Sequence, residues 1–268
     1  MNWQPIEKIY EESCKSYKDN FASFRKDKKI ISIIPEFAGE KLHESVPLLW
    51  SMIKNNKEIY KNRHKFQKND IIGNPIILEI SPKEFYSLST LRYMVMLGNI
   101  IDNFGSLNDM NIIEIGGGYG GLCNCIHQIF TPKSYDSYDL EGVNLLTENY
   151  LTHVQELQRY DDELTNRIWN VKCKYIDDVD YDKKYDLVIS TSALNEFPEE
   201  TQDNYFEIIK ICNKGYLEGS YKGEAGKPRD DHIIKKLEEN KINFTIEENK
   251  SWKGHIKTIC WNKGTFKL

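Results

Sequence analysis

The chain has 268 residues and a net charge of -5 at neutral pH, with 40% hydrophobic and 29% charged residues. This length is enough for a domain with its own core, and the composition is that of a globular protein rather than a disordered one. The acidic balance argues against a nucleic-acid partner, because phosphate binding requires a basic face. No apolar run reaches the roughly 18 residues of a membrane-spanning helix.

The N-terminal residues and the cysteines indicate the compartment of the protein and whether it binds a metal. The N-terminal residues lack the basic start and apolar core of a signal peptide. The six cysteines form no CxxC pair, and the spacing of Cys123 and Cys125 is too close for zinc. We therefore expect reduced thiols in a cytoplasmic protein without a bound metal. Association into a homo-oligomer stays open.

The first 80 residues mix lysine-rich and asparagine-rich stretches with short apolar runs, and helices are expected around 5–24 and 45–61. We interpret this part as an N-terminal helical cap, followed by a second domain over residues 81–268. Ser81-Pro82-Lys83-Glu84 has the pattern of a helix start, with an N-cap serine, a proline at the first position and a capping-box glutamate. The pattern predicts a helix from there to about Asn103.

From Asn111 onward, short apolar runs alternate with helical stretches. The expected strands are 111–115, 134–138, 171–176, 187–190, 215–218, 244–247 and 256–261, and the expected helices are 122–130, 144–157, 199–212 and 230–240. This alternation predicts an α/β fold, with a seven-stranded, mostly parallel sheet covered by helices on both faces. Only a turn separates the last two strands, so we expect them to form an antiparallel hairpin.

A glycine-rich turn, Glu114-Ile115-Gly116-Gly117-Gly118-Tyr119-Gly120-Gly121, follows the strand at 111–115. A strand, a glycine turn and a helix N-terminus together bring backbone amides against a nucleotide, and glycine permits the close approach. Gly116, Gly118 and Gly120 satisfy GxGxG, whereas Gly121 in place of Gly120 gives the GxGxxG of dinucleotide sites. The spacing predicts a nucleotide-type cofactor and leaves its kind open.

Acidic residues follow the next two expected strands. Asp139 closes the strand at 134–138, where a carboxylate can accept the ribose hydroxyl hydrogens, with Asp136 and Glu141 as alternatives. Asp177 and Asp178 follow the third strand. They have two interpretations, as contacts to the ligand or as part of a solvated acidic loop.

The fourth expected strand should end at the ligand crevice, because ligands bind at the carboxyl ends of such strands. Ser190, Ser192, Asn195 and Glu196 therefore lie where a substrate would react. Asn195 and Glu196 have a second interpretation, which is to end the strand and cap the next helix. His255 is a further candidate, since the turn before the last strand can fold over the crevice.

The pattern Glu114-x-Gly116-x-Gly118-x-Gly120 resembles that of class I S-adenosylmethionine (SAM) dependent methyltransferases. Tyr138-Asp139-Leu140-Glu141 and the segment from Ser190 to Glu196 extend the resemblance to a bacterial sugar O-methyltransferase family, over roughly residues 85–220. The resemblance implies a Rossmann-like class I methyltransferase fold with SAM as cofactor and S-adenosylhomocysteine (SAH) as product. It assigns the following residues to the cofactor: Glu114, Gly116, Gly117, Gly118, Tyr119, Gly120, Asp139, Leu140, Asp177, Asp178 and Ser190.

The same resemblance implies a hydroxyl acceptor on a sugar or nucleotide-activated sugar of surface-polysaccharide (capsule or lipopolysaccharide) synthesis. A hydroxyl must lose its proton as the new bond forms. We therefore predict Glu196 as the base, Asn195 beside it as the residue that orients the hydroxyl, and His255 as the runner-up for the base. Contacts to sugar and phosphate groups are expected from three residues of the cap: Arg63, His64 and Lys65.

Three alternatives stay open at this point. The first is N-methylation of an amino sugar or a small amine, which needs less help from a base. The second is an NAD-binding oxidoreductase, which would use the dinucleotide spacing of the glycine turn. The third is a non-catalytic nucleotide-binding module.

Overall fold

The computed structural model describes residues 4–17, 22–33, 45–158, 169–220, 232–249 and 256–263. The chain divides into two compact units. The first unit holds residues 1–107, 118–131 and 140–169, and the second holds residues 108–117, 132–139 and 170–268. The boundary at residue 80 that the sequence suggested stays a prediction.

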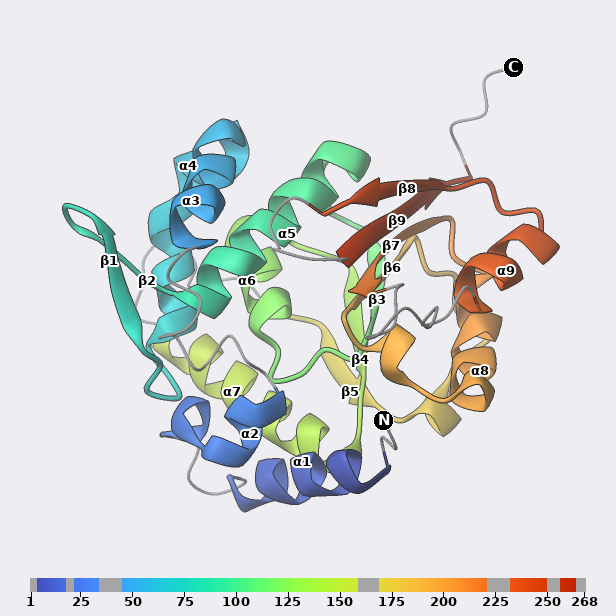
Figure 1. The fold of residues 1–268 in the computed structure, drawn as a ribbon, viewed down its shortest axis with the longest axis horizontal. Helices are drawn as coiled ribbons and strands as arrows, with labels where there is room; N and C mark the ends of the chain where they lie inside the picture. Colours follow the sequence, from blue (N-terminus) through green and yellow to red (C-terminus); the bar gives the residue numbers. More distant parts are fainter. Residues whose placement is uncertain are drawn as a thin grey trace. The chain divides into compact units, whose positions relative to one another are not determined.

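The second unit is built on a seven-stranded sheet with the order β5-β4-β3-β6-β7-β9-β8 (Figure 1). Its strands are β3 (Asn111–Ile115), β4 (Ser134–Tyr138), β5 (Val171–Lys174), β6 (Leu187–Thr191), β7 (Lys214–Ser220), β8 (Thr245–Glu248) and β9 (Ile256–Asn262). The first five are parallel to one another, whereas β9 runs antiparallel to both β7 and β8. The predicted Rossmann-like, mostly parallel sheet with an antiparallel C-terminal hairpin is confirmed.

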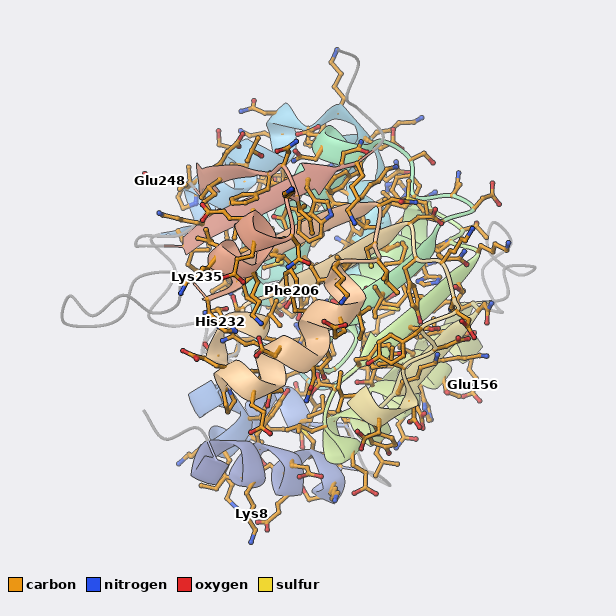
Figure 2. The ribbon with its side chains drawn as sticks, turned by 90° about the vertical axis from the view of Figure 1, so that its right-hand side faces the viewer. Lys8, Glu156, Phe206, His232, Lys235 and Glu248 are labelled. Atoms are coloured by element: carbon orange, nitrogen blue, oxygen red, sulfur yellow. The ribbon has the colours of Figure 1, made fainter. Side chains whose placement is uncertain are left out.

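Two helices of the second unit, α8 (Glu199–Ile209) and α9 (His232–Glu239), share a hydrophobic core with one face of this sheet. Phe206 of α8 is a buried member of that core, and it is labelled with His232 of the neighbouring α9 in Figure 2. Asp203 of α8 holds α9 in place, because it pairs with His232 (2.7 Å) and Lys236 (2.8 Å). Short turns of 3-10 helix, η5 (Ile176–Asp178) and η6 (Leu194–Glu196), follow β5 and β6.

The first unit is mainly helical. It contains α1 (Gln4–Ser16), η1 (Phe24–Lys26), α2 (Lys28–Ile33), α3 (Val46–Asn55), α4 (Lys57–Asn62), η4 (Arg63–Asp70), α5 (Leu88–Phe104), α6 (Gly121–Ile129) and α7 (Glu141–Gln158). Within this unit α1 packs on α7, and α5 packs on both α3 and α6. Helices from the first 80 residues are therefore in contact with helices that come much later in the chain.

The predicted start of the helix at Ser81 is wrong. Residues on both sides of Pro82 instead form a hairpin of β1 (Ile77–Ser81) and β2 (Glu84–Ser87). Proline fixes φ near the value that both a helix start and the second position of a type II turn require, and Lys83 follows with φ +69°, as the third position of that turn demands. The helix α5 begins at Leu88, where Ser87 caps it by accepting from the Thr90 amide (3.2 Å).

All six cysteines are free thiols, and all but Cys173 are buried. Among the residues that the structure describes, no helix has the length and apolar character needed to cross a bilayer. The same residues contain no group of three histidine, cysteine or acidic side chains placed to bind a metal.

Gly215 of β7 offers a test of the sheet packing. A methyl group at this position would lie 2.0–2.3 Å from ring carbons of Trp261, which is buried on β9. We expect Gly215→Ala to lower the free energy of unfolding by about 1–3 kcal/mol or more, as overpacked cores do. Urea denaturation measures this change. Glu247→Ala on the exposed strand β8 is the control, with an expected change below about 0.5 kcal/mol; equal effects would contradict the packing.

Candidate functional site

The strand order of the sheet reverses between β3 and β6, since β4 and β5 continue on one side and β7 on the other. In open α/β sheets, ligands bind outside the carboxyl ends of the strands at such a reversal. These ends are followed by Gly116 after β3 and by Ser192 after β6. Both residues belong to the second unit, and they mark the position of the candidate site.

Gly116 and Ala193 meet at this point. Gly116 has φ +75°, and a side chain on it would place its first carbon 2.0 Å from the Ala193 methyl group. Ser192, next to Ala193, has φ +64°, although it is not a glycine, and its amide donates to the Glu218 carbonyl (2.7 Å). Non-glycine residues in this region of φ are costly and concentrate at functional sites. The sequence predicts Ser192 in the reacting region, and this stays a prediction.

Glu114 of β3 is a buried carboxyl whose Oε2 accepts a hydrogen bond from the Tyr135 hydroxyl (2.8 Å). Burial raises the pKa of Glu114 to about 7, the Tyr135 hydrogen bond opposes this rise, and the charge of Asp139 adds to it. A side chain on Gly117 would lie 2.3 Å from the Ser137 hydroxyl and 2.9 Å from Glu114 Oε2. Glu114 and Ser137 therefore fill the space on one side of the turn.

Tyr135 and Ser137 did not stand out in the sequence. They alternate along β4, so both point to the same face, and Ser137 is the register partner of Glu114. Strand alternation together with parallel pairing would have indicated both residues.

Asp136, the alternative for the ribose contact, is engaged inside the protein through its Oδ2 atom. It is fully buried and accepts from Lys174 (2.8 Å), Lys183 (2.8 Å) and Tyr185 (2.6 Å). Burial alone would raise its pKa, but these hydrogen bonds hold the pKa of Asp136 below its usual range. Asp139, three residues later, is partly exposed at the end of β4.

The residues after β5 and β4 differ in their local roles. Asp177 and Asp178 are both exposed, and Asp178 accepts from the Tyr175 amide (3.2 Å) and so closes its own turn. Leu140, in the first unit, is partly exposed, and its carbonyl accepts from the Asn144 amide (2.8 Å) at the start of α7.

Ser190, expected to contact the cofactor, uses its hydroxyl inside the protein. It donates to the Ile115 carbonyl (2.9 Å) and accepts from the Leu194 amide (3.3 Å). It thereby joins the ends of β3 and β6 and fixes the segment that carries the candidate catalytic residues.

Asn195 and Glu196 lie together in η6, immediately after this segment. Asn195 is buried against the backbone of Gly219, where an added side chain would come 2.3 Å from its Oδ1. Glu196 is partly exposed. His255, the runner-up as the base, lies outside the described residues.

The remaining part of the glycine turn belongs to the first unit. Gly118 has φ +56°, and a side chain on it would meet no described atom closer than 3.9 Å. Gly120 has φ +87°, and a side chain there would touch α7 at 3.0–3.2 Å. Tyr119 between them is buried, and its hydroxyl accepts from Asn69 (3.1 Å). The Tyr119 side chain is therefore part of the core, and only its backbone is left for a ligand. Of the two glycines, Gly118 has the more room among the described atoms.

Arg63 of the expected substrate patch is engaged with its neighbours. Its Nε donates to Glu84 of β2 (2.7 Å), and its guanidinium lies 4.4 Å from the centre of the Tyr60 ring. His64 is exposed and Lys65 is partly exposed. The patch thus offers His64 and Lys65 to solvent, while Arg63 joins η4 to the hairpin.

No protein-family model matches the chain. No curated protein is similar to it in sequence. Among solved structures, it is similar to magnesium protoporphyrin IX methyltransferase from Synechocystis PCC 6803 with bound SAM, at 13% identity over 77% of this chain and 93% of that one, with a TM-score of 0.44. It is similar to the methyltransferase domain of a bacterial Hen1 protein, at 13% identity over 62% of this chain and 96% of that one, with a TM-score of 0.44. The chain is also similar to a protein from Thermoplasma acidophilum, at 10% identity over 76% of this chain and 98% of that one, with a TM-score of 0.47. We therefore infer function from the residues of this chain.

The raised pKa of Glu114 makes stability depend on pH. Between pH 4.5, the usual value, and about 7, the folded protein holds this proton more tightly than the unfolded chain does. The free energy of unfolding should therefore fall across this window, by up to roughly 3 kcal/mol from this group, and level off above it. Glu114→Gln removes this contribution, so the variant should gain stability relative to the wild type as the pH rises. Denaturant titrations at pH 5, 6, 7 and 8 measure the free energy of unfolding of both proteins. If the two free energies changed with pH in the same way, the raised pKa of Glu114 would be contradicted.

Proposed function

We propose that the chain is a SAM-dependent methyltransferase. The observation that carries this proposal is Gly118, which has a positive φ in a glycine turn and where a side chain would meet no described atom closer than 3.9 Å. This turn is close in the chain to the strand reversal of a parallel sheet. Backbone amides at such a turn can approach a ligand closely, because no side chain intervenes. In this proposal the methionine end of SAM lies near Gly116 and Gly118, and Asp139 accepts the ribose hydroxyl hydrogens.

The sheet favours SAM over a dinucleotide. The usual dinucleotide-binding sheet has six strands that run in parallel. Here a seventh strand, β9, is inserted antiparallel between β7 and β8, as the resemblance to class I methyltransferases leads one to expect. Glu114, two residues before the first glycine, supports the same choice.

The proposed reaction is methyl transfer to a hydroxyl of a sugar or nucleotide-activated sugar, in surface-polysaccharide synthesis. Bound SAM would supply an electrophilic methyl group and leave as SAH. The residues of this chain must hold the acceptor oxygen in line with that group, which supplies much of the rate. Glu196 takes the proton that the acceptor hydroxyl loses, and Asn195, buried beside it, fixes the segment. Lys65 and His64 are the proposed contacts for acceptor phosphate and sugar groups.

Two substitutions test the cofactor assignment. Gly118→Val should abolish SAM binding, because a branched side chain would enter the open space. Asp139→Ala should weaken binding by about 1.5–3 kcal/mol, the cost of losing hydrogen bonds to a charged group. Glu148→Ala is the matched control, since this carboxylate is exposed on α7 and has no role in the proposed site. Calorimetric titration measures all three, and unchanged affinity in both Gly118→Val and Asp139→Ala would exclude this site.

The base is tested by Glu196→Gln. Loss of a general base typically lowers kcat by about 10²–10⁴, whereas SAM affinity should stay the same. Glu200→Gln, on the exposed side of α8, is the control and should keep full activity. Initial rates with sugar-nucleotide and amine acceptors measure the effect. Full activity of Glu196→Gln on hydroxyl acceptors would refute this role, and activity on amines alone would identify an N-methyltransferase.

A further inference from the structure

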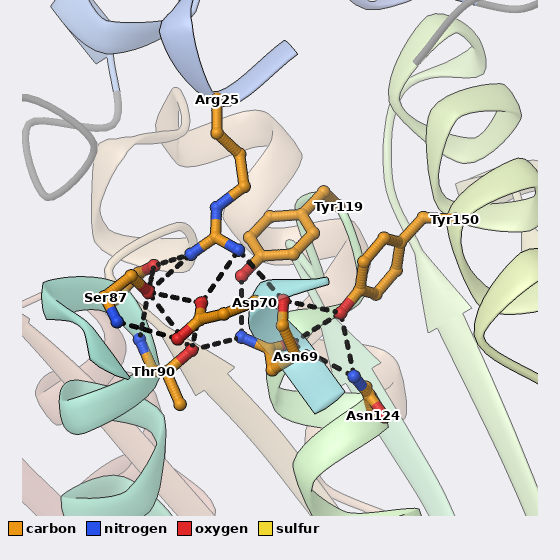
Figure 3. A network of polar contacts seen from close by, with 9 residues as sticks. Arg25, Asn69, Asp70, Ser87, Thr90, Tyr119, Asn124 and Tyr150 are labelled. Atoms are coloured by element: carbon orange, nitrogen blue, oxygen red, sulfur yellow. Dashed lines mark hydrogen bonds and ion pairs between the residues drawn. The ribbon is translucent and has the colours of Figure 1, made fainter. Parts of the chain in front are cut away.

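A buried ion pair lies at the centre of a polar network in the first unit (Figure 3). Arg25 Nη1 lies 3.0 Å from Asp70 Oδ1, and the two side chains are 0% and 6% exposed. Arg25 Nη2 also donates to the hydroxyls of Ser87 (2.6 Å) and Ser89 (2.5 Å), while Asp70 accepts from the Ser87 amide (2.7 Å) and the Thr90 hydroxyl (2.8 Å). Buried charges with this many partners have one favourable arrangement, because breaking the pair leaves an uncompensated charge. The network is therefore a rigid support.

The same network extends to Tyr119 of the glycine turn. Asn69, next to Asp70, donates to the Tyr119 hydroxyl (3.1 Å) and accepts from the Tyr150 hydroxyl (2.6 Å) (Figure 3). The Tyr119 ring lies 5.3 Å from the Phe24 ring and 5.0 Å from the Tyr150 ring, and the Arg25 guanidinium is 5.3 Å from its centre. Aromatic pairs and cation–π contacts at these distances are stabilising. Tyr119 is thus held by rings, a cation and a hydrogen bond.

The backbone on either side of Tyr119 consists of glycines with positive φ, which have the most conformational freedom of any residue. Such a turn needs an external restraint to keep one shape. The restraints within this unit include the Tyr119 side chain, the Thr147 hydroxyl, which donates to the Gly118 carbonyl (2.5 Å), and the Asn124 backbone amide, which donates to the Gly120 carbonyl (2.9 Å). The shape of the turn at Gly118 therefore depends in part on the buried Tyr119 side chain.

We propose that Tyr119 is a positioning residue for the cofactor turn, held in place by Phe24, Arg25 and Asn69. The affinity for the cofactor then depends on residues of the N-terminal region that never touch the cofactor. This inference rests on the proposed function for the identity of the ligand, but not for the role of Tyr119 in ordering the turn.

The test compares Tyr119→Leu with Tyr119→Phe in the full chain. Leucine loses the ring contacts and the hydrogen bond, whereas phenylalanine loses only the hydroxyl. We expect Tyr119→Leu to weaken SAM binding by about tenfold or more, which is the scale of one aromatic pair and one hydrogen bond, and Tyr119→Phe by about threefold or less. Hydrogen exchange of the 117–121 amides in the ligand-free protein should accelerate in the same order.

Leu49→Ala is the control for a merely structural role. It removes a buried side chain of α3 in the same unit, outside the network, and should lower the melting temperature without changing SAM affinity or exchange in the turn. Arg25→Lys is the second variant if Tyr119→Leu does not fold, because it keeps the charge but loses the paired donors, and it should also accelerate exchange in the turn.

Wild-type affinity and wild-type turn exchange in Tyr119→Leu would overturn the inference. Equal losses of affinity in Leu49→Ala would overturn it as well. Absence of SAM binding in the wild type would refute the proposed function instead, and the exchange comparison would still decide the role of Tyr119.

Discussion

A side chain at residue 116 would overlap Ala193, and this steric constraint determines how the strand ends of the second unit come together. With glycine there, the chain after β6 can approach the chain after β3, and Ser190 fixes the approach by donating to the Ile115 carbonyl (2.9 Å). Ser192 in the same segment has an unfavourable φ of +64°. The reversal of strand order, the glycine turn and the segment with Asn195 and Glu196 are therefore parts of one construction.

The carboxylates near this construction have different roles because their environments differ. Glu114 is buried, and no cation among the described residues pairs with it, so its pKa rises to about 7 and the group suits a supporting position under the turn. Asp136 is also buried, but two lysines and a tyrosine keep it ionised and tie the edge of the sheet together. Only Asp139 combines a strand-end position with partial exposure, which is what a ribose contact requires. Environment, rather than residue type, separates these three acidic side chains.

The sequence predicted the sheet well, and β3 and β4 have the predicted bounds. The strand β3 is a mostly apolar run before the glycine turn, and β4 carries two tyrosines among its polar residues. It misplaced the start of α5, because Pro82 suits a helix start and a turn equally, and only pairing with β1 decides between them. It missed the Arg25–Asp70 pair, whose members are 45 positions apart and acquire their meaning only when both are buried. It assigned Tyr119 and Ser190 to the ligand, but their side chains bond within the protein, which no local pattern reveals.

Cofactor identity is the claim on which the proposed chemistry depends, and calorimetric titration of the wild-type protein with SAM, SAH and NAD tests it most directly. The account predicts one site that binds SAM and SAH, with no heat of binding from NAD. Binding of NAD with no response to SAM or SAH would contradict it, and would assign the glycine turn to a dinucleotide.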